Sequence, residues 1–355
     1  MDFQHAHTGL WRTVRGGVLP WLLVLALAAP QQVWGWGNAG HEAVACVAWQ
    51  QLHSDTQKRV MQLLAMVPTL QNADHTKSIP GFADWVNDLP SGLSQDERNL
   101  YLFMRAATWP DSIKHQWLRD SDTPPAGSGP SEHAVGYTDT ASHGYWHFVD
   151  AGFASDQSKV PDTPAPNAAT QIAELRTAIA STDAGLDLLK SYELIWLEHL
   201  VGDIHQPLHG TVRFFMNKGD EGGNAVIIKL PTAMKKQFEG TLSKSAPAEL
   251  HAFWDDLPGE GQPAPALPFA VTFGKALAAA KDGVSDTDPN HWAGESLTLA
   301  KKDAYHTPIG DGPTPAGGSS YAITQVYYDT AMQDAQARIA LAGARLAKLL
   351  NENLH

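Results

Sequence analysis

One segment of the sequence, from Leu186 to Asp203, most restricts the folds open to this chain. Its residues are apolar on most faces of a helix, and such a pattern predicts a buried helix rather than a surface one. The segment also carries two ionisable residues, His199 and Asp203, at positions i and i+4, which point from the same face of a helix. The sequence therefore predicts a fold organised around a central helix that presents a His and an Asp together.

The rest of the chain is also predicted to be mainly helical. Ser54–Gln57 has the pattern of a capping box, and apolar residues at helical spacing follow it. Ile172–Ile179 and Ile339–Leu350 predict two further helices. Strand patterns are scarce, although Asn224–Leu230 predicts a short hairpin arm. The expected fold class is mainly α, a single-domain helical bundle with little β structure.

Charge and cysteine content exclude two classes of protein. The chain of 355 residues has 25 Lys and Arg against 38 Asp and Glu, a formal net charge of −13. This acidic balance argues against a protein that holds nucleic acid on a general basic surface. Cys46 is the single cysteine, so no internal disulfide can form. The 16 histidines are many for this length, and His is the commonest metal ligand among side chains.

The N-terminal residues 1–35 are predicted to be a secretory signal peptide. Arg12 and Arg15 provide a basic flank, and the apolar stretch Gly17–Ala29 follows. A short membrane anchor is the alternative, but this stretch is below the roughly 18 residues that a spanning helix needs. The expected cleavage lies between Gly35 and Trp36. The mature domain, 36–355, is then secreted or periplasmic, with no stable membrane association.

The strongest local motif is His199-Leu-Val-Gly-Asp203-Ile-His205-Gln-Pro-Leu-His209. Pro207 turns the chain after the helix and brings His209 toward the pocket that His199 and Asp203 face. Two His and one Asp in that arrangement suit a zinc ion. A buried His held by a neighbouring carboxylate is the commoner reading of an isolated His–Asp pair, but three candidate ligands within eleven residues favour a metal.

Further candidate ligands occur elsewhere in the chain. His251 and Asp255 repeat the i, i+4 spacing, although a solvated helix face is an equally good reading of that pair alone. All the donors are nitrogen or oxygen, which favours catalytic over purely structural zinc. Together, the candidates are enough for more than one metal: His41, Asp111, His147, His199, Asp203, His209, His251 and Asp255.

Six blocks in this order resemble the zinc-dependent single-strand nucleases and 3′-nucleotidases, also called nuclease type I or the mung bean nuclease type. The resemblance runs from Trp36 to the final helix. Zinc-dependent phospholipases C share that helical architecture but are not expected to carry the fifth block. The blocks are Trp36-Gly…Gly40-His41, Ala107-x-Trp-x-Asp111, His147-Phe-x-Asp150, His199-x3-Asp203-x-His-Gln-Pro-Leu-His209, Gly219-Asp220-x-Gly-Gly-Asn224 and Leu250-His251-x2-Trp-Asp255.

The resemblance implies a cleft with three zinc ions. Asp203 would bridge the first ion to the second, and the second would also use the free α-amino nitrogen and carbonyl oxygen of Trp36. Removal of the signal peptide would therefore be a condition of activity. The implied ligand sets are Asp111, His147, His199 and Asp203 for the first ion, Trp36, His41 and Asp203 for the second, and His209, His251 and Asp255 for the third.

The resemblance also implies substrates and roles. The implied reaction is hydrolysis of single-stranded DNA, RNA and 3′-nucleotides to 5′-phosphate products by a metal-activated water. Asp150 would orient that water or accept its proton, next to the bridging Asp203. The nucleobase would bind at Asn224, with Gly222, Gly223 and Asp220. No protein partner is expected. Two alternatives remain, a phospholipase C of the same architecture and a non-catalytic exported zinc-binding protein.

Overall fold

The structure is a computed structural model that describes residues 36–67, 89–113, 142–238, 246–259, 266–277, 279–280 and 282–355. These residues belong to one compact unit, Val33–His355. The predicted signal peptide, 1–35, lies outside the described residues. Among the described helices, none has the length and apolar character that crossing a bilayer requires.

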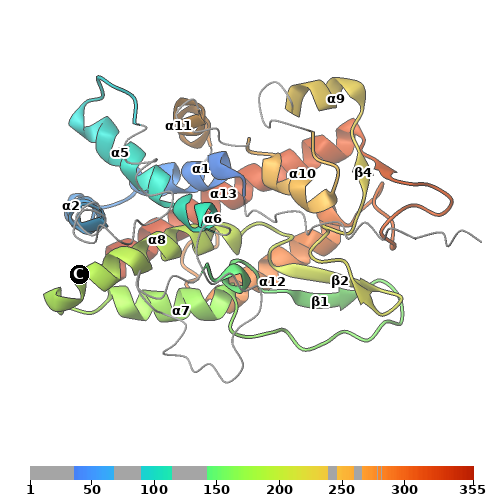
Figure 1. The fold of residues 1–355 in the computed structure, drawn as a ribbon, viewed down its shortest axis with the longest axis horizontal. Coiled ribbons are helices and arrows are strands. Elements are labelled where there is room, and N and C mark those ends of the chain that lie inside the picture. The colour runs from blue at the N-terminus through green and yellow to red at the C-terminus, as the bar shows by residue number, and fades with distance from the viewer. Residues whose placement is uncertain are drawn as a thin grey trace, which may run out of the picture. The chain divides into compact units, whose positions relative to one another are not determined.

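Helices make up most of the described chain, so the prediction of a mainly α fold is confirmed (Figure 1). The longer helices are α1 (Asn38–Trp49), α2 (Ser54–Leu64), α5 (Gln95–Ala106), α7 (Ala168–Ile179), α8 (Asp187–Asp203), α11 (Ala266–Ala276), α12 (Pro289–Leu299) and α13 (Gln325–Asn353). The shorter ones are α6 (Trp109–Ser112), α9 (Thr232–Gln237), α10 (Leu250–Asp256), the 3-10 turns η3 (Gly144–His147) and η4 (Ala184–Leu186), and the π-helical turn η6 (Ala300–Ala304).

Helix α8 lies at the centre of the fold, as the sequence predicts. Every residue from Lys190 to Asp203 is buried. The helix packs against α7 on one side and against α1, α2 and α13 on others (Figure 1). Because α8 is apolar on most faces, exposing any of them to water is unfavourable, and the neighbouring helices enclose it. Its last turn, which carries His199 and Asp203, is thereby held inside the protein.

Two small sheets accompany the helices. Strand β1 (Ala151–Ala154) pairs in parallel with β2 (Thr211–Phe215), and β2 pairs antiparallel with β3 (Lys218–Gly219). The first sheet begins directly after two site segments, because β1 follows Asp150 and β2 follows His209. Strand β4 (Ile228–Lys229) pairs in parallel with β5 (Tyr321–Ala322). The predicted hairpin arm within Asn224–Leu230 is therefore wrong, since its strand finds a partner far away in the sequence.

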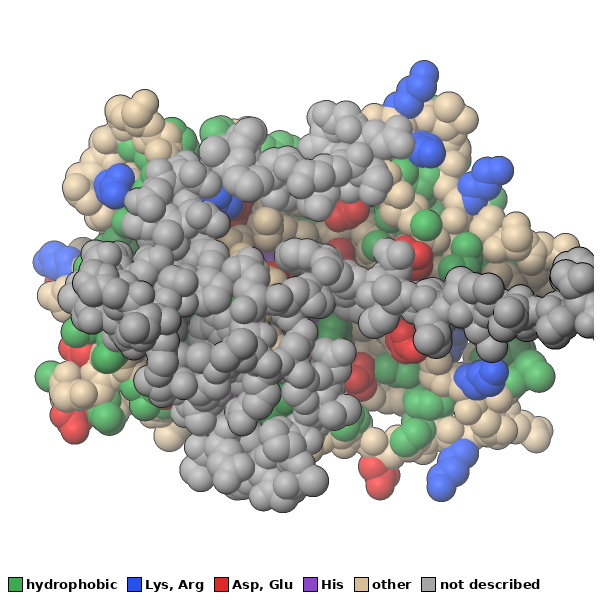
Figure 2. All heavy atoms as spheres, in the orientation of Figure 1, with side chains coloured by type: hydrophobic (Ala, Val, Ile, Leu, Met, Phe, Trp, Pro, Cys, Tyr) green, Lys and Arg blue, Asp and Glu red, His purple; other side chains and the backbone are tan. Residues whose placement is uncertain are grey.

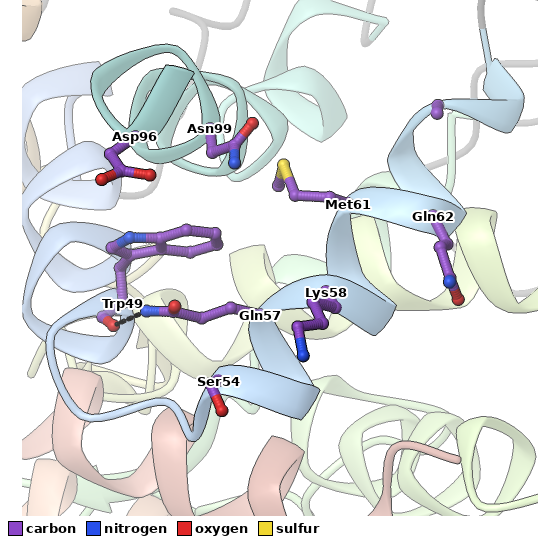
Figure 3. Close-up of a pocket in the computed structure, with 9 residues that line it drawn as sticks. Trp49, Ser54, Gln57, Lys58, Met61, Gln62, Asp96 and Asn99 are labelled. Atoms are coloured by element: carbon purple, nitrogen blue, oxygen red, sulfur yellow. Dashed lines mark hydrogen bonds between the residues drawn. The ribbon is translucent and has the colours of Figure 1, made fainter. Parts of the chain in front are cut away.

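The predicted capping box at Ser54 is also wrong. Helix α2 begins at Ser54 itself, so His53 takes the N-cap position and makes no side-chain cap bond. The Gln57 amide donates instead to the carbonyl oxygen of Trp49, 3.0 Å away (Figure 3). That carbonyl lies in the last turn of α1, where helical partners are lacking. The side chain therefore satisfies the end of the previous helix rather than the start of its own.

Candidate metal centre

The eight predicted His and Asp ligands all lie in three buried groups. The atoms that could hold an ion lie within 4.8 Å of one another in each group. The groups are His41 with Asp111 and His199, His147 with His199 and Asp203, and His209 with His251 and Asp255. Residues far apart in the sequence thus meet where the end of α8, the start of α1, α6 and α10 come together.

The carboxylate of Asp203 lies between four imidazole rings. Its Oδ2 is 2.9 Å from His147 Nδ1 and 3.0 Å from His199 Nε2. Its Oδ1 is 3.4 Å from His41 Nε2 and 3.6 Å from His209 Nδ1. Burial disfavours the charge on Asp203, yet His199 and His209 hold its pKa well below the usual range. One carboxylate can therefore serve ligand groups on both sides of it.

Asp111 completes the first side of the centre. Its Oδ1 is 3.6 Å from His199 Nε2 and 3.7 Å from His147 Nδ1, and its Oδ2 is 4.0 Å from His41 Nε2. The rings of His41 and His199 stack at 3.9 Å. Burial and the neighbouring His199 lower the pKa of His41, so its ring is held neutral, the form in which imidazole binds metal.

The third group shows most directly that the site suits a cation. His209 Nδ1 bonds the carbonyl oxygen of His147 at 2.8 Å, and His251 Nδ1 bonds that of Gly222 at 2.6 Å. A carbonyl only accepts, so each Nδ1 carries the proton and each Nε2 has a lone pair. The two Nε2 atoms face each other at 3.1 Å. Two lone pairs at that distance repel unless a cation lies between them.

Asp255 adds an oxygen to that group. Its Oδ2 is 3.4 Å from His251 Nε2 and its Oδ1 is 3.7 Å from His209 Nε2. The Gln206 amide donates to Oδ1 at 2.6 Å. Burial raises the pKa of Asp255 well above the usual range. Within the described part of the chain, neither Asp255 nor Asp203 forms an ion pair with Lys or Arg, and the groups that face both carboxylates are imidazole rings.

A backbone carbonyl orients each of three ligand rings. Besides His209 and His251, His199 uses Nδ1 to bond the carbonyl oxygen of Ala107 at 2.7 Å. Such bonds fix the tautomer and direct Nε2 into the centre, which is the usual arrangement around metal-binding His. The donor chemistry, the burial and the ring orientation therefore all fit metal ions.

Trp36 is buried at the edge of the same centre. A Cβ placed on Gly40 would lie 2.6 Å from Trp36 Cβ, so the tryptophan packs on the turn of α1 that precedes His41. The next residue, Gly37, donates its backbone N–H to the carbonyl oxygen of Asp255 at 2.9 Å. Trp36 and Gly37 thus contact segments that carry two of the ligand groups.

Asp150 lies on the segment beside His209. Its φ is +57°, a left-handed conformation that Asp tolerates better than most residues. The flanking amides of Val149 and Ala151 donate to the carbonyls of His209 and Gly210. Burial raises the pKa of Asp150 to about 6. The ring of the neighbouring Phe148 stacks on the His209 ring at 4.6 Å, so this segment packs directly against one of the candidate ligands.

The predicted nucleobase element, Gly219–Asn224, contacts the third group through its backbone. The Asn224 side chain is half-buried and donates to the carbonyl of Glu221 at 2.7 Å. Asp220 is buried and is hydrogen-bonded within the protein. Gly222 and Gly223 have positive φ values of +61° and +90°. The loop therefore lies next to His251, with Asn224 the most accessible of its four predicted residues.

Two neighbours of the ligands were not predicted. Gln206 holds Asp255 and also accepts from the Leu208 amide, and its place inside the His205-Gln-Pro-Leu-His209 block is the signal that could have found it. Glu42 is fully buried next to His41 and pairs with Arg105, 3.2 Å away. Burial raises the pKa of Glu42 to about 8. No local pattern links Glu42 to Arg105, which lies on α5.

On the face shown in Figure 2, Asp and Glu side chains are visible between the grey atoms and also at the left and lower edges, and most of the visible Lys and Arg side chains lie toward the edges. A separate pocket of about 810 Å³ lies between α1, α2 and α5 and is lined by Trp49, Met61 and polar residues such as Asn99 (Figure 3). It contains none of the predicted ligands and has no histidine.

Comparison with known proteins finds relatives that match most of the chain. The family model described as S1/P1 Nuclease matches residues 36–355. Endonuclease 4 of Arabidopsis thaliana is 25% identical over 335 residues, which covers 89% of this chain and 88% of the relative. Nuclease S1 of Aspergillus oryzae is 24% identical over 348 residues, covering 92% and 94%. Endonuclease 2 of Arabidopsis thaliana is 25% identical over 235 residues, covering 66% and 58%.

Proposed function

Because this chain belongs to the S1/P1 nuclease family, and is therefore a nuclease, we propose that it is a zinc-dependent endonuclease for single-stranded DNA and RNA. Its products carry 5′-phosphates, and it also removes phosphate from 3′-nucleotides. The names of two relatives, Endonuclease 4 and Nuclease S1, support cleavage within a nucleic acid strand. The zinc dependence and the strand preference are argued from the site.

The observation that carries the proposal is the meeting of three buried His and Asp groups around Asp203. All donors are imidazole nitrogen and carboxylate oxygen, a set that suits zinc and is more typical of catalytic than of purely structural sites. We assign three zinc ions to the centre. The first is held by Asp111, His147, His199 and Asp203, the second by His41, Asp203 and the α-amino and carbonyl groups of Trp36, and the third by His209, His251 and Asp255.

Bound zinc supplies positive charge that neutralises the phosphate and makes a water molecule acidic enough to attack phosphorus. The residues of the chain do the rest. Asp203 contacts two ligand groups and so holds them at a fixed separation. Asp150, whose pKa burial raises to about 6, is suited to accept a proton from the attacking water. His147 and His199 keep the Asp203 carboxylate ionised.

The same centre accounts for nucleic acid binding by an acidic protein. A net charge of −13 repels a polyanion, but cations gathered in one cleft attract it locally. Single strands are preferred because a base must leave its stack to reach Asn224 beside His251, and unstacking a duplex costs free energy. The loop 219–224 is the proposed contact for that base.

The test uses the mature protein that begins at Trp36. Acid-soluble nucleotide is measured from single-stranded DNA, RNA and duplex DNA, and phosphate from a 3′-nucleotide, with a short-chain phospholipid as the control substrate. We expect cleavage of single strands that chelator abolishes and zinc restores. Turnover of the lipid alone would overturn the proposal in favour of a phospholipase C, and zinc uptake without any turnover would show a non-catalytic binding protein.

Export and processing form part of the proposal. Residues 1–35 are a signal peptide, and cleavage before Trp36 produces the secreted or periplasmic enzyme and frees the α-amino group that serves the second zinc. N-terminal sequencing of protein from the periplasm or medium should read Trp-Gly-Asn. A variant with one extra residue before Trp36 should bind one zinc ion more weakly and lose activity. Equal zinc binding and turnover by that variant would remove Trp36 from the ligand set.

A further inference from the structure

The loop Gly219–Asn224 controls how His251 is oriented. The carbonyl oxygen of Gly222 accepts a hydrogen bond from His251 Nδ1 at 2.6 Å, and the backbone N–H of His251 is 3.4 Å from the carbonyl oxygen of Gly223. Because Nδ1 must donate to a carbonyl, Nε2 is left with the lone pair that faces His209 and Asp255. Without the Gly222 carbonyl, His251 could present either nitrogen.

Only glycine fits at position 222. Its φ is +61°, and a Cβ there would lie 2.6 Å from the carbonyl oxygen of Leu208 and 3.2 Å from His251 Nδ1. Leu208 directly precedes the ligand His209. The loop backbone is therefore pressed against two ligand segments at once, and a side chain at this position would push its carbonyl away from His251.

The Asp220 side chain holds this loop in place. It is only 7% exposed, and its Oδ1 accepts from the backbone amides of Arg213 at 3.0 Å and Gly223 at 3.3 Å, and from the Tyr305 hydroxyl at 3.2 Å. Its Oδ2 lies 3.3 Å from Arg213 Nε, and the Arg213 guanidinium stacks over the Tyr305 ring at 4.4 Å. Asp220 thus joins strand β2, η6 and the loop.

We propose that Asp220 and Gly222 are positioning residues for the third metal group, acting through the His251 ring rather than through substrate. The proposal depends on one part of the proposed function, the binding of zinc at His209, His251 and Asp255, and does not depend on nuclease activity. The two roles of the loop are compatible, since the half-buried Asn224 side chain bonds the carbonyl of Glu221, whereas Gly222 bonds His251. Bonds that orient metal-binding His typically change metal affinity by about 10- to 100-fold.

The test is zinc retention by the mature protein during dialysis against increasing chelator, measured without nucleic acid. Asp220→Ala should weaken the binding of one zinc ion by about 10- to 100-fold and leave the others unchanged. Asp220→Asn should restore most of that affinity, because an amide oxygen can still accept from the Gly223 and Arg213 amides. The matched control is Asp156→Ala, which removes a carboxylate that also accepts two backbone amides, from Ser158 and Met216.

A second readout separates this proposal from the proposed function. Nitrogen-15 NMR of the zinc-free protein should show His251 as the Nδ1–H tautomer. The His251 signal is assigned from its loss in His251→Gln. In Asp220→Ala, the same signal should show a mixture of the two tautomers. Should Asp220→Ala fail to fold, Tyr305→Phe decides, with roughly fivefold weaker binding of one zinc expected. Unchanged zinc binding in the folded variant, or an Nε2–H tautomer in the unaltered protein, would overturn the proposal whether or not the enzyme cleaves nucleic acid.

Discussion

The segment Asp203–His209 has two sides that use similar residues in opposite ways. On one side, Asp203 and His209 face other His and Asp residues, and no Lys or Arg of the described residues pairs with Asp203. On the other side, His205 Nε2 accepts from Arg345 at 2.9 Å, and its carbonyl accepts from Arg338 at 3.1 Å. Among the described residues, the first side therefore has no Lys or Arg, whereas the second side has two arginines.

The second side is a hydrogen-bonded network in which Arg345, Arg338 and Ser296 are buried and the Glu295 side chain is 36% exposed. Both guanidinium groups reach the Glu295 carboxylate, Arg345 through two bonds of 2.7 Å and Arg338 through one of 2.8 Å. Ser296 accepts from Arg338 and donates to the carbonyl of Ile204 at 2.6 Å. The difference teaches that a buried His is structural where Arg supplies the charge and that it marks a metal site where the charge is missing. His205 therefore packs in this network, where it also bonds the carbonyl of Val201.

The largest expected effect comes from removing the metal. At zinc concentrations 1,000-fold above the dissociation constant, each bound ion stabilises the folded state by about 4 kcal/mol. Chelation should therefore lower the thermal unfolding midpoint of the mature protein by at least about 10 °C, measured by circular dichroism. Re-addition of zinc should restore the midpoint. The same midpoint with and without chelator would contradict the contrast between the two sides.

Substitution of the bridging carboxylate comes next. Asp203→Asn keeps the shape but removes the charge that serves two ligand groups, so zinc affinity should fall by more than about 100-fold and nuclease activity should be lost. Asp183→Asn is the control, since it makes the same change at the exposed N-cap of η4. A variant at Asp203 that retains both zinc content and turnover would rule out the bridging role.

On the network side, Arg345→Met should reduce stability by about 2 to 4 kcal/mol, because it leaves Glu295 and His205 without their main partner. The loss should be the same with and without zinc, in contrast to Asp203→Asn. Chemical denaturation under both conditions measures it. Lys348→Met is the control on the same helix, where the pair with Glu352 is exposed and contributes under about 1 kcal/mol. If Arg345→Met lowered the free energy of unfolding only when zinc is bound, the two sides would not be independent.

The smallest effect is expected for His205→Gln. Glutamine keeps a donor and an acceptor, so the free energy of unfolding should fall by about 1 kcal/mol. Zinc content, measured by native mass spectrometry, should be unchanged, unlike in His199→Gln, which removes a ligand. Loss of a zinc ion in His205→Gln would show that His205 belongs to the metal side after all.

Much of the site could be predicted from the sequence, because the candidate metal ligands are recognisable side chains and because helical spacing places pairs of them on one face. The i, i+4 pairs His199 with Asp203 and His251 with Asp255 follow from helix geometry alone. The carbonyls that orient the rings could not be predicted, since every residue has one. The carbonyls of Ala107 and Gly222 become partners only through the fold.

The fold shows the same division. The buried α8 was predictable because its apolar residues leave no solvated face. Strand β1, with the sequence Ala-Gly-Phe-Ala, has no alternating pattern, and its parallel pairing with β2 depends on the turn at His209 that precedes β2. Similarly, nothing near Ile228 indicates Tyr321 as its partner. Pairings across long separations depend on the packed helices that bring the strands together.

Anomalous X-ray diffraction at the zinc edge, on crystals of the mature protein, tests the central claim most directly. We expect three peaks that match the three proposed zinc sites. The first lies among Asp111, His147, His199 and Asp203, the second beside His41, Asp203 and Trp36, and the third between His209, His251 and Asp255. We expect no peak beside His205, where Arg345 supplies the charge. Absence of density at the three groups in zinc-soaked crystals, or ions bound elsewhere, would contradict the account.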